Sequence, residues 1–109
     1  NGETMLLENA VALALFRKYG HDSDHERVFF YNDRGEVDFY VPEDELAIQV
    51  SYSMTKSDET FEREVGALKK LPKVLPCRRR LVLTNDETDA VEDEFGKIEI
   101  MPVWQWLLQ

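Results

Sequence analysis

The pattern of apolar and polar residues along the chain predicts two long helices. The first covers residues 3–19, is apolar nearly all round and ends at Gly20. The second covers residues 58–71, where acidic residues in the first turns and lysines in the last turn suit the helix dipole, and Pro72 ends it. A short helix or cap is expected at residues 103–108. Helical structure is therefore predicted at both ends and in the middle of the chain.

Between the two long helices, the segment GEVDFYVPEDELAIQVSYS at residues 35–53 predicts an antiparallel hairpin. Strand-forming residues alternate with polar ones on either side of PEDE, a turn that begins with a proline. The alternation puts Val37 and Phe39 on one face of the first strand, and Asp38 and Tyr40 on the other. One face of this hairpin is therefore expected to be apolar and the opposite face polar.

The full set of strand signals indicates an α/β domain. They lie at residues 27–32, 36–41, 46–52, 78–84 and 97–103. The apolar centre of residues 78–84 suggests a strand buried on both faces, whereas residues 85–96 are acidic and are expected to form a loop, with a short helical turn as an option. The predicted order is αβββαββα, with a mixed central sheet of about five strands flanked by helices.

Composition supports one folded domain over residues 1–109. The chain is 43% hydrophobic and 11% aromatic, which is typical of a globular domain rather than a disordered segment. Its apolar runs are far shorter than a membrane span, and its first stretch is a helix rather than a signal peptide. The single Cys77 allows no internal disulfide, so we expect a reducing, cytoplasmic setting without membrane contact.

Net charge limits the classes of partner. The chain carries 22 acidic and 13 basic residues, a net charge of −9, which disfavours nucleic acid because affinity for a phosphate backbone comes mainly from basic residues. Six bases are nevertheless close together in the sequence: Lys69, Lys70, Lys73, Arg78, Arg79 and Arg80. They could form a local basic patch; the plainer interpretation is a solvated helix end followed by an exposed strand edge.

Four polar residues occupy positions that invite a chemical role. Glu8 lies on a largely apolar stripe of the first helix, where a carboxylate is costly unless it is paired or binds a cation. An edge position, with Glu8 extended to solvent or paired with a base of the same helix, explains it equally well. In the hairpin, Asp38 is expected near Gln49, with Ser51 on the same polar face. The solvent side of a half-exposed sheet would explain that face without any chemistry.

Other candidate chemistries have weaker signals. His21 and His25 have the spacing of a helical metal pair, but the segment GHDSDHER is rich in loop-forming residues. Cys77 follows a proline and has no histidine near it in sequence, which leaves a nucleophilic role with little support. Trp104 and Trp106 in MPVWQWLL either form a contact surface, where Trp is enriched, or cap the domain's own core.

Three segments, LLENAVALAL, GEVDFYV and AIQVSYS, together resemble the PD-(D/E)xK, restriction-endonuclease-like domains. More narrowly, they are similar to the C-terminal domain of a group of uncharacterised prokaryotic AAA-type ATPases. The resemblance covers nearly the whole chain, including the order of its elements. It implies that the chain is a C-terminal fragment whose ATPase domain, a partner within the same polypeptide, is missing. No GxxxxGK(S/T) loop occurs in residues 1–109, so ATP use is expected only in the full-length protein.

In active members of that fold the chemistry is metal-assisted hydrolysis of phosphodiesters, so the resemblance implies a Mg²⁺ site. Asp38 would be the strand acid that binds the metal, and Glu8 would match the helix glutamate that holds it through water. Gln49 stands where a second acid is usual, and the backbone carbonyl of Val50 would complete that side of the site. These four residues form the metal set that the resemblance implies.

Ser51 departs from the family, because it stands at the position of the usual lysine. That lysine supplies positive charge to the nucleophile or the transition state, and losing one such group costs about 10² to 10³ in rate. Lys56, Arg63 or Lys97 could replace the missing cation from elsewhere in the chain.

Three functions remain open. The first is a non-catalytic accessory domain of an ATPase, which makes contacts within its own protein or with a protein partner. The second is a divergent Mg²⁺-dependent nuclease acting on DNA or RNA. The third is nucleic-acid binding without cleavage through the bases at 69–80, which the net charge disfavours. The residues at positions 49 and 51 favour the first.

Overall fold

The computed structural model of the chain describes residues 2–20, 29–31, 37–55 and 57–109. Its helices and strands follow one another as α1 (Gly2–Tyr19), β1 (Phe29–Tyr31), β2 (Val37–Val41), β3 (Leu46–Val50), α2 (Asp58–Lys70), β4 (Arg79–Thr84), β5 (Asp89–Asp93), β6 (Gly96–Pro102) and α3 (Val103–Leu107). Short 3₁₀ turns, Pro42–Asp44 and Leu71–Lys73, follow β2 and α2. Both long helices lie where the sequence predicts them. Within the described residues, no helix has the length and apolar character that crossing a membrane requires.

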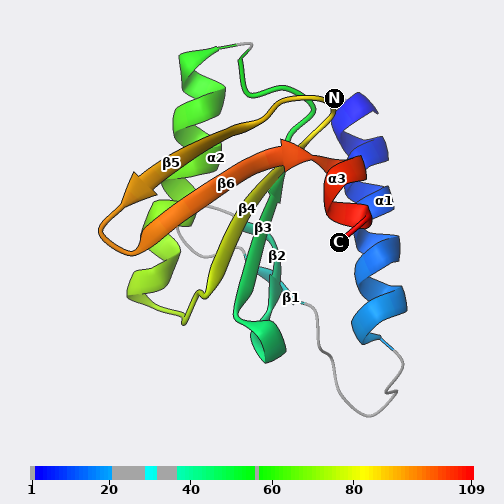
Figure 1. Cartoon of the computed structure of the whole chain (residues 1–109), viewed down its shortest axis with the longest axis horizontal. Helices are drawn as coiled ribbons and strands as arrows, with labels where there is room; N and C mark the ends of the chain where they lie inside the picture. The colour runs from blue at the N-terminus through cyan, green and yellow to red at the C-terminus, as the bar shows by residue number, and fades with distance from the viewer. Residues whose placement is uncertain (1, 21–28, 32–36, 56) are drawn as a thin grey trace.

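A mixed sheet forms the centre of the domain (Figure 1). Its strand order is β1-β2-β3-β4-β6-β5, with β4 parallel to both β3 and β6 and the other neighbours antiparallel. The helix α2 connects the parallel strands β3 and β4, as such pairs require a crossover. The predicted α/β class and mixed sheet are confirmed, and the described part of the chain contributes six strands.

The additional strand, β5, lies within residues 85–96, which the sequence predicts to be a loop; that prediction is wrong. The strand pairs with β6 in an antiparallel hairpin, and Gly96, the first residue of β6 after the turn, has φ 114°, a conformation that favours glycine. It forms the edge of the sheet, so its acidic side chains largely face solvent, and Val91 alone of its apolar residues packs against the core. One inward apolar residue gives too weak an alternation to identify a strand from sequence.

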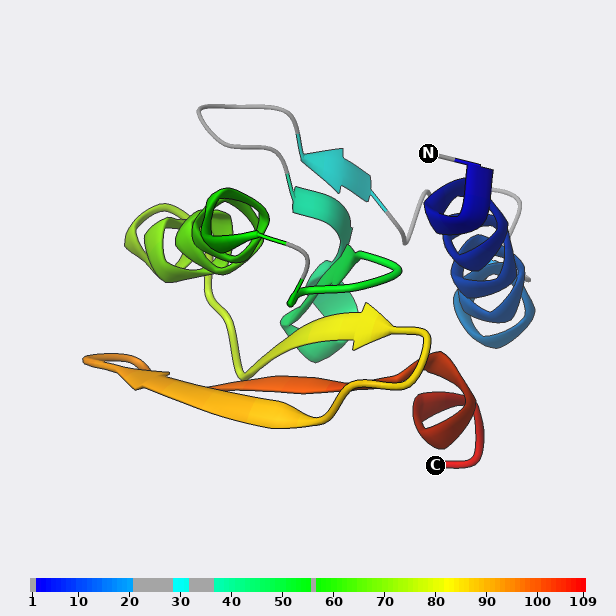
Figure 2. The same cartoon turned by 90° about the horizontal axis from the view of Figure 1, so that it is seen from above.

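Helices cover both faces of the sheet (Figure 2). On one face, α1 and α3 pack on a core cluster that includes Val11, Leu15 and Val103. On the other face, α2 packs on a second cluster that includes Val65 and Leu68. The two central strands β3 and β4 are therefore buried along almost their whole length, as the sequence predicts for β4.

The two tryptophans of helix α3 differ in exposure. Trp106 is partly buried and packs against the cluster under α1, whereas Trp104 is 58% exposed. Trp106 therefore caps the domain's own core, and Trp104 is left on the surface.

A buried arginine ties the β5 edge to the centre of the sheet. Arg80, on β4, is 2% exposed, and its guanidinium donates two hydrogen bonds to the carboxylate of Asp93, at 2.7 and 2.8 Å. It also donates to the backbone carbonyl of Leu68 on α2, at 3.1 Å. The hydrogen bonds from the guanidinium lower the pKa of the Asp93 carboxyl. One side chain thus joins β4, β5 and α2.

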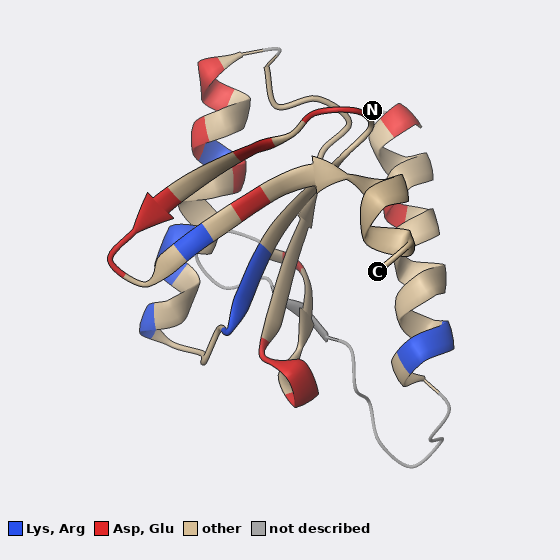
Figure 3. Cartoon of the chain, viewed as in Figure 1, with Lys and Arg blue, Asp and Glu red and all other residues tan. Residues whose placement is uncertain are grey.

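This role changes the interpretation of the bases at 69–80. Arg80 is buried, and Arg79 pairs with Glu99 on the neighbouring strand, at 3.1 Å. Figure 3 shows the other bases of this group near the end of α2 and the start of β4, while acidic residues dominate β5 and the turn after β2. Fewer bases are therefore available to a phosphate backbone than the sequence suggests.

We expect Asp93→Asn to lower the free energy of unfolding by about 3 kcal/mol, because it leaves the buried Arg80 guanidinium without its counter-charge. Urea unfolding followed by circular dichroism measures the change. Glu99→Gln is the matched control, because it removes the partner of the part-exposed Arg79 and should cost less than about 1 kcal/mol. Small and equal effects of the two substitutions would contradict the role assigned to the buried bridge.

Candidate functional site

The β2–β3 hairpin changes its bonding where Asp38 faces Gln49. Regular antiparallel pairing ends at Phe39 opposite Ile48. One step further, the backbone N–H of Asp38 donates to Oε1 of Gln49 at 2.9 Å, and the backbone N–H of Val50 donates to Oδ2 of Asp38 at 2.8 Å. Asp38 and Gln49 are therefore neighbours, as the hairpin register predicts, and their side chains take over the cross-strand bonding.

A bulge in β2 explains why the predicted alternation fails at the start of this strand. Phe29 of β1 lies opposite Tyr40, but Tyr31 lies opposite Val37, so the register shifts between the two pairs. Over this stretch β2 contains one more residue than β1. The extra residue reverses the face of the sheet on which the side chains beyond it lie. Val37 consequently packs with Tyr40 in the cluster under α2, and Phe39 lies in the cluster under α1. The prediction that Val37 and Phe39 share a face is wrong.

Gln49 and Ser51 are both buried and both have hydrogen-bond partners. Gln49 is 2% exposed, and its Nε2 donates to the backbone carbonyl of Glu64 on α2, at 3.3 Å. The hydroxyl of Ser51 donates to the backbone carbonyl of Ser53, at 3.0 Å. Because α2 covers this side of the sheet, the Gln49 amide lies in the interior and joins β2, β3 and α2.

A cavity of about 290 Å³ opens beside the hairpin. Its lining includes Glu8 from α1, Asp38 from β2, Val50 and Ser51 from the end of β3, and Arg63 and Glu64 from α2. The structure therefore brings Glu8, Asp38 and Ser51 to one place. The Gln49 side chain, in contrast, is not part of this lining.

Glu64 is the acidic residue that the sequence pattern does not single out. It lies one helical turn after Thr60 on α2, and both residues line the cavity. The pKa of Glu64 is raised to about 7, chiefly by burial and then by the negative charge of Asp38. Glu8 adds a smaller effect of the same sign. At neutral pH the cavity therefore contains a carboxyl group that is partly protonated.

Arg63 is the replacement cation that the described part of the chain places at the cavity. Its guanidinium lies 3.6 Å from the carboxylate of Glu64 and lowers the pKa of that group. The Arg63 side chain is 65% exposed, so solvent screens much of its charge. Lys97 instead lies on β6 opposite Glu92, and Lys56 lies outside the described residues.

The metal set implied by the resemblance is only partly gathered around the cavity. Glu8, Asp38 and Val50 line it, whereas the side-chain oxygen of Gln49 is bonded to the backbone of Asp38. Among the residues that the structure describes, no group of three or more His, Cys, Asp or Glu side chains could hold a metal ion.

The remaining candidate chemistries gain little from the structure. His21 and His25 lie outside the described residues. Cys77 is partly buried, and its Sγ donates to the backbone carbonyl of Leu75 at 3.5 Å. Burial raises the pKa of the Cys77 thiol to about 11, so this group is protonated at neutral pH and is a poor nucleophile.

We expect Gln49→Glu to destabilise the domain by about 2 kcal/mol at neutral pH, because a buried carboxylate cannot donate to the Glu64 carbonyl. At acidic pH the loss should shrink, since a protonated carboxyl regains a donor. Gln49→Met, of similar size and without charge, is the control whose cost should not change with pH. Urea unfolding at the two pH values measures both. Wild-type stability of Gln49→Glu at neutral pH would show that this side chain can leave its partners and enter the cavity.

The raised pKa of Glu64 predicts a pH-dependent stability. The folded protein binds this proton more tightly than the unfolded chain, so the stabilisation is complete below the ordinary value of 4.5 and is lost as pH rises through about 7. Glu64→Gln should therefore be more stable than the wild type above neutral pH, by as much as about 3 kcal/mol. Thermal unfolding across pH measures this, with Glu92→Gln on the exposed β5 edge as the control. Parallel pH profiles of wild type and Glu64→Gln would refute the assignment.

Comparisons with known proteins give the family and an uncharacterised relative. Uncharacterized protein MJ1544 from Methanocaldococcus jannaschii is 34% identical over 111 residues. The match covers 94% of this chain and 24% of the relative, so the chain spans about a quarter of the length of that protein. No solved structure matches the chain. Residues 3–106 match the family described as "Domain of unknown function (DUF4143)", and the chain belongs to this family.

Proposed function

We propose that this chain is a catalytically degenerate accessory domain with a nuclease-type fold. It acts through protein contacts, either within a larger protein of the AAA-type ATPase family or with a separate protein partner. The proposal is supported by the bonding of the hairpin residues and by the resemblance of three sequence segments to such C-terminal domains.

The observation that carries the proposal is the use of Asp38 and Gln49 to hold the hairpin together. In a working metal site their oxygens would face the ion. Here Oδ2 of Asp38 accepts from the backbone of Val50, and Oε1 of Gln49 accepts from the backbone of Asp38. A metal bound by Gln49 would take away the acceptor of a backbone N–H, which costs free energy. Ser51 adds no charge, and its hydroxyl is bonded to Ser53.

The relative's length supports a context in a longer protein. The chain corresponds to 24% of that relative, which leaves room there for further domains. On this proposal, ATP binding belongs to the ATPase domain, since residues 1–109 contain no GxxxxGK(S/T) loop. The single cysteine fits the reducing, cytoplasmic setting of such a protein.

A divergent Mg²⁺-dependent nuclease acting on DNA or RNA is the second candidate, because one observation favours it. Glu8, Asp38 and Glu64 line one cavity, and the charges of the first two help to raise the pKa of the third. Clustered carboxylates attract a divalent cation, and Arg63 could supply positive charge beside them. This alternative requires the side chains to move closer together than the structure places them.

Titration of Mn²⁺, as a probe for Mg²⁺, into the domain by calorimetry distinguishes the two candidates. We expect no saturable binding to the wild type, because Oδ2 of Asp38 and Oε1 of Gln49 already accept hydrogen bonds from the hairpin backbone. Asp38→Asn is the test variant, since its amide oxygen still accepts from Val50 and preserves the fold. Asp89→Asn, on the exposed β5 edge, is the matched control.

Saturable binding that Asp38→Asn abolishes and Asp89→Asn retains would overturn the proposal in favour of the nuclease. Cleavage assays on DNA and RNA would then be informative, with Ser51→Lys restoring the usual cation. Heat changes that are equal in all three proteins would indicate only non-specific attraction to an acidic chain, in agreement with the proposal.

A further inference from the structure

An apolar stripe runs along the outer face of α1. Four large apolar side chains of this helix are more than half exposed: Met5 at 62%, Leu6 at 71%, Leu13 at 53% and Phe16 at 63%. At about 100° per residue, these four side chains fall within an arc of about 100°, with Asn9 near its middle. The helix packs on the domain through other positions, namely Val11, Leu15 and Tyr19. The exposed arc contains no charged residue.

A stripe that is exposed in the single chain indicates a surface that another protein surface covers. A monomeric protein rarely leaves several large apolar side chains of one helix in water, and a patch of this kind commonly marks an interaction site. None of these residues lines the cavity beside Asp38, so the stripe is separate from that candidate site.

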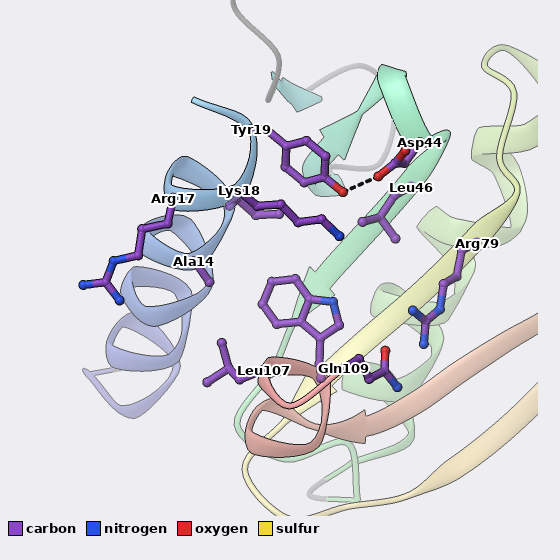
Figure 4. A pocket seen from close by; sticks show the side chains of 11 residues that line it. Ala14, Arg17, Lys18, Tyr19, Asp44, Leu46, Arg79, Leu107 and Gln109 are labelled. Atoms are coloured by element: carbon purple, nitrogen blue, oxygen red, sulfur yellow. Dashed lines mark hydrogen bonds between the residues drawn. The ribbon is translucent and has the colours of Figure 1, made fainter. Parts of the chain in front are cut away.

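Two opposite charges flank the stripe near its two ends. Arg17 and Glu3 project about 20° and about 60° beyond its Leu6 side, and they lie about 21 Å apart along the helix axis. Arg17 is among the residues that line the cavity of about 470 Å³ between α1 and α3; Figure 4 shows its guanidinium turned outwards, while Lys18 extends across the cavity. Both Glu3 and Arg17 are exposed, and neither forms an ion pair with another described residue.

We propose that the stripe is the interface of a homodimer, in which α1 of a second copy packs antiparallel across a two-fold axis near Asn9. Such an axis puts each α1 residue opposite a residue of the second copy, and the numbers of the two residues add up to about 20. Leu6 then meets Leu13 of the second copy, and Met5 meets Phe16. Each contact occurs twice, and the two copies of Asn9 lie next to the axis.

The flanking charges identify a second copy as the occupant and set its direction. In the antiparallel arrangement, Glu3 of each chain lies beside Arg17 of the other. A parallel two-fold pair would instead put the Leu6 sides of the two helices on opposite sides of the contact, so neither Glu3 nor Arg17 would have the opposite charge beside it. Antiparallel packing also opposes the two helix dipoles favourably. Because one helix pair makes a small interface, the dimer is weak and reversible.

Sedimentation velocity over a range of concentrations tests the dimer. The wild-type weight-average mass should rise from one chain towards two. Phe16→Glu should weaken self-association at least about tenfold, because it buries a charge against Met5 of the second copy. Val74→Glu is the matched control: Val74 is 64% exposed and lies outside α1, so association should not change. Unchanged circular dichroism and melting of each variant separate loss of the dimer from loss of the fold.

Charge reversal tests the specific pairing. Glu3→Arg and Arg17→Glu should each weaken association, and the double variant should restore it, since the pair is only inverted. A double variant no better than either single variant would overturn the antiparallel arrangement. A wild-type chain that stays monomeric at every concentration would overturn the dimer and leave the stripe to another part of a longer polypeptide. Equal weakening by Val74→Glu and Phe16→Glu would also overturn it.

Discussion

Burial of the central strands on both faces is the constraint on which the other contacts depend. Because α1 and α3 cover one face and α2 the other, each polar side chain on β3 or β4 needs a partner inside the protein. Gln49 bonds to β2 and α2, Arg80 bonds to Asp93 and α2, and the hydroxyl of Thr84 donates to the backbone carbonyl of Glu87. Within the described residues, no buried side-chain nitrogen or oxygen lacks a hydrogen-bond partner.

The same constraint shapes the candidate site. A polar residue at the end of a buried strand can either bind a ligand or form hydrogen bonds within the protein. Gln49 forms hydrogen bonds within the protein. The covering helix α2 also brings Glu64 into the cavity and removes it from water, which is the main reason that its pKa is raised. The site is therefore acidic but poorly prepared for a cation, since the Glu64 carboxyl is partly neutral and the Gln49 amide is turned inwards.

Local signals explain how much of the structure could be predicted from sequence. The helix ends are marked by Gly20 and Pro72, and the apolar centre of β4 indicates its burial, so these elements could be predicted. The neighbourhood of Asp38 and Gln49 follows from the hairpin register, but the direction of the Gln49 amide depends on where α2 packs. The side on which Val37 lies depends on a bulge opposite β1, and the place of Glu64 depends on tertiary packing. Neither the bulge nor the tertiary packing of Glu64 leaves a periodic pattern in the sequence.

The acidic edge strand β5 has a consequence for behaviour in concentrated solution. An unpaired edge presents backbone N–H and C=O groups to which a strand of another molecule can add, and this is how sheets grow into aggregates. On β5 the carboxylates of Asp89 and Glu92 are exposed, so two such edges repel each other at neutral pH. Neutral side chains at these two positions would remove that protection without removing the backbone pairing of β5 with β6. The charges that obscure this strand in the sequence thus also keep the sheet from growing.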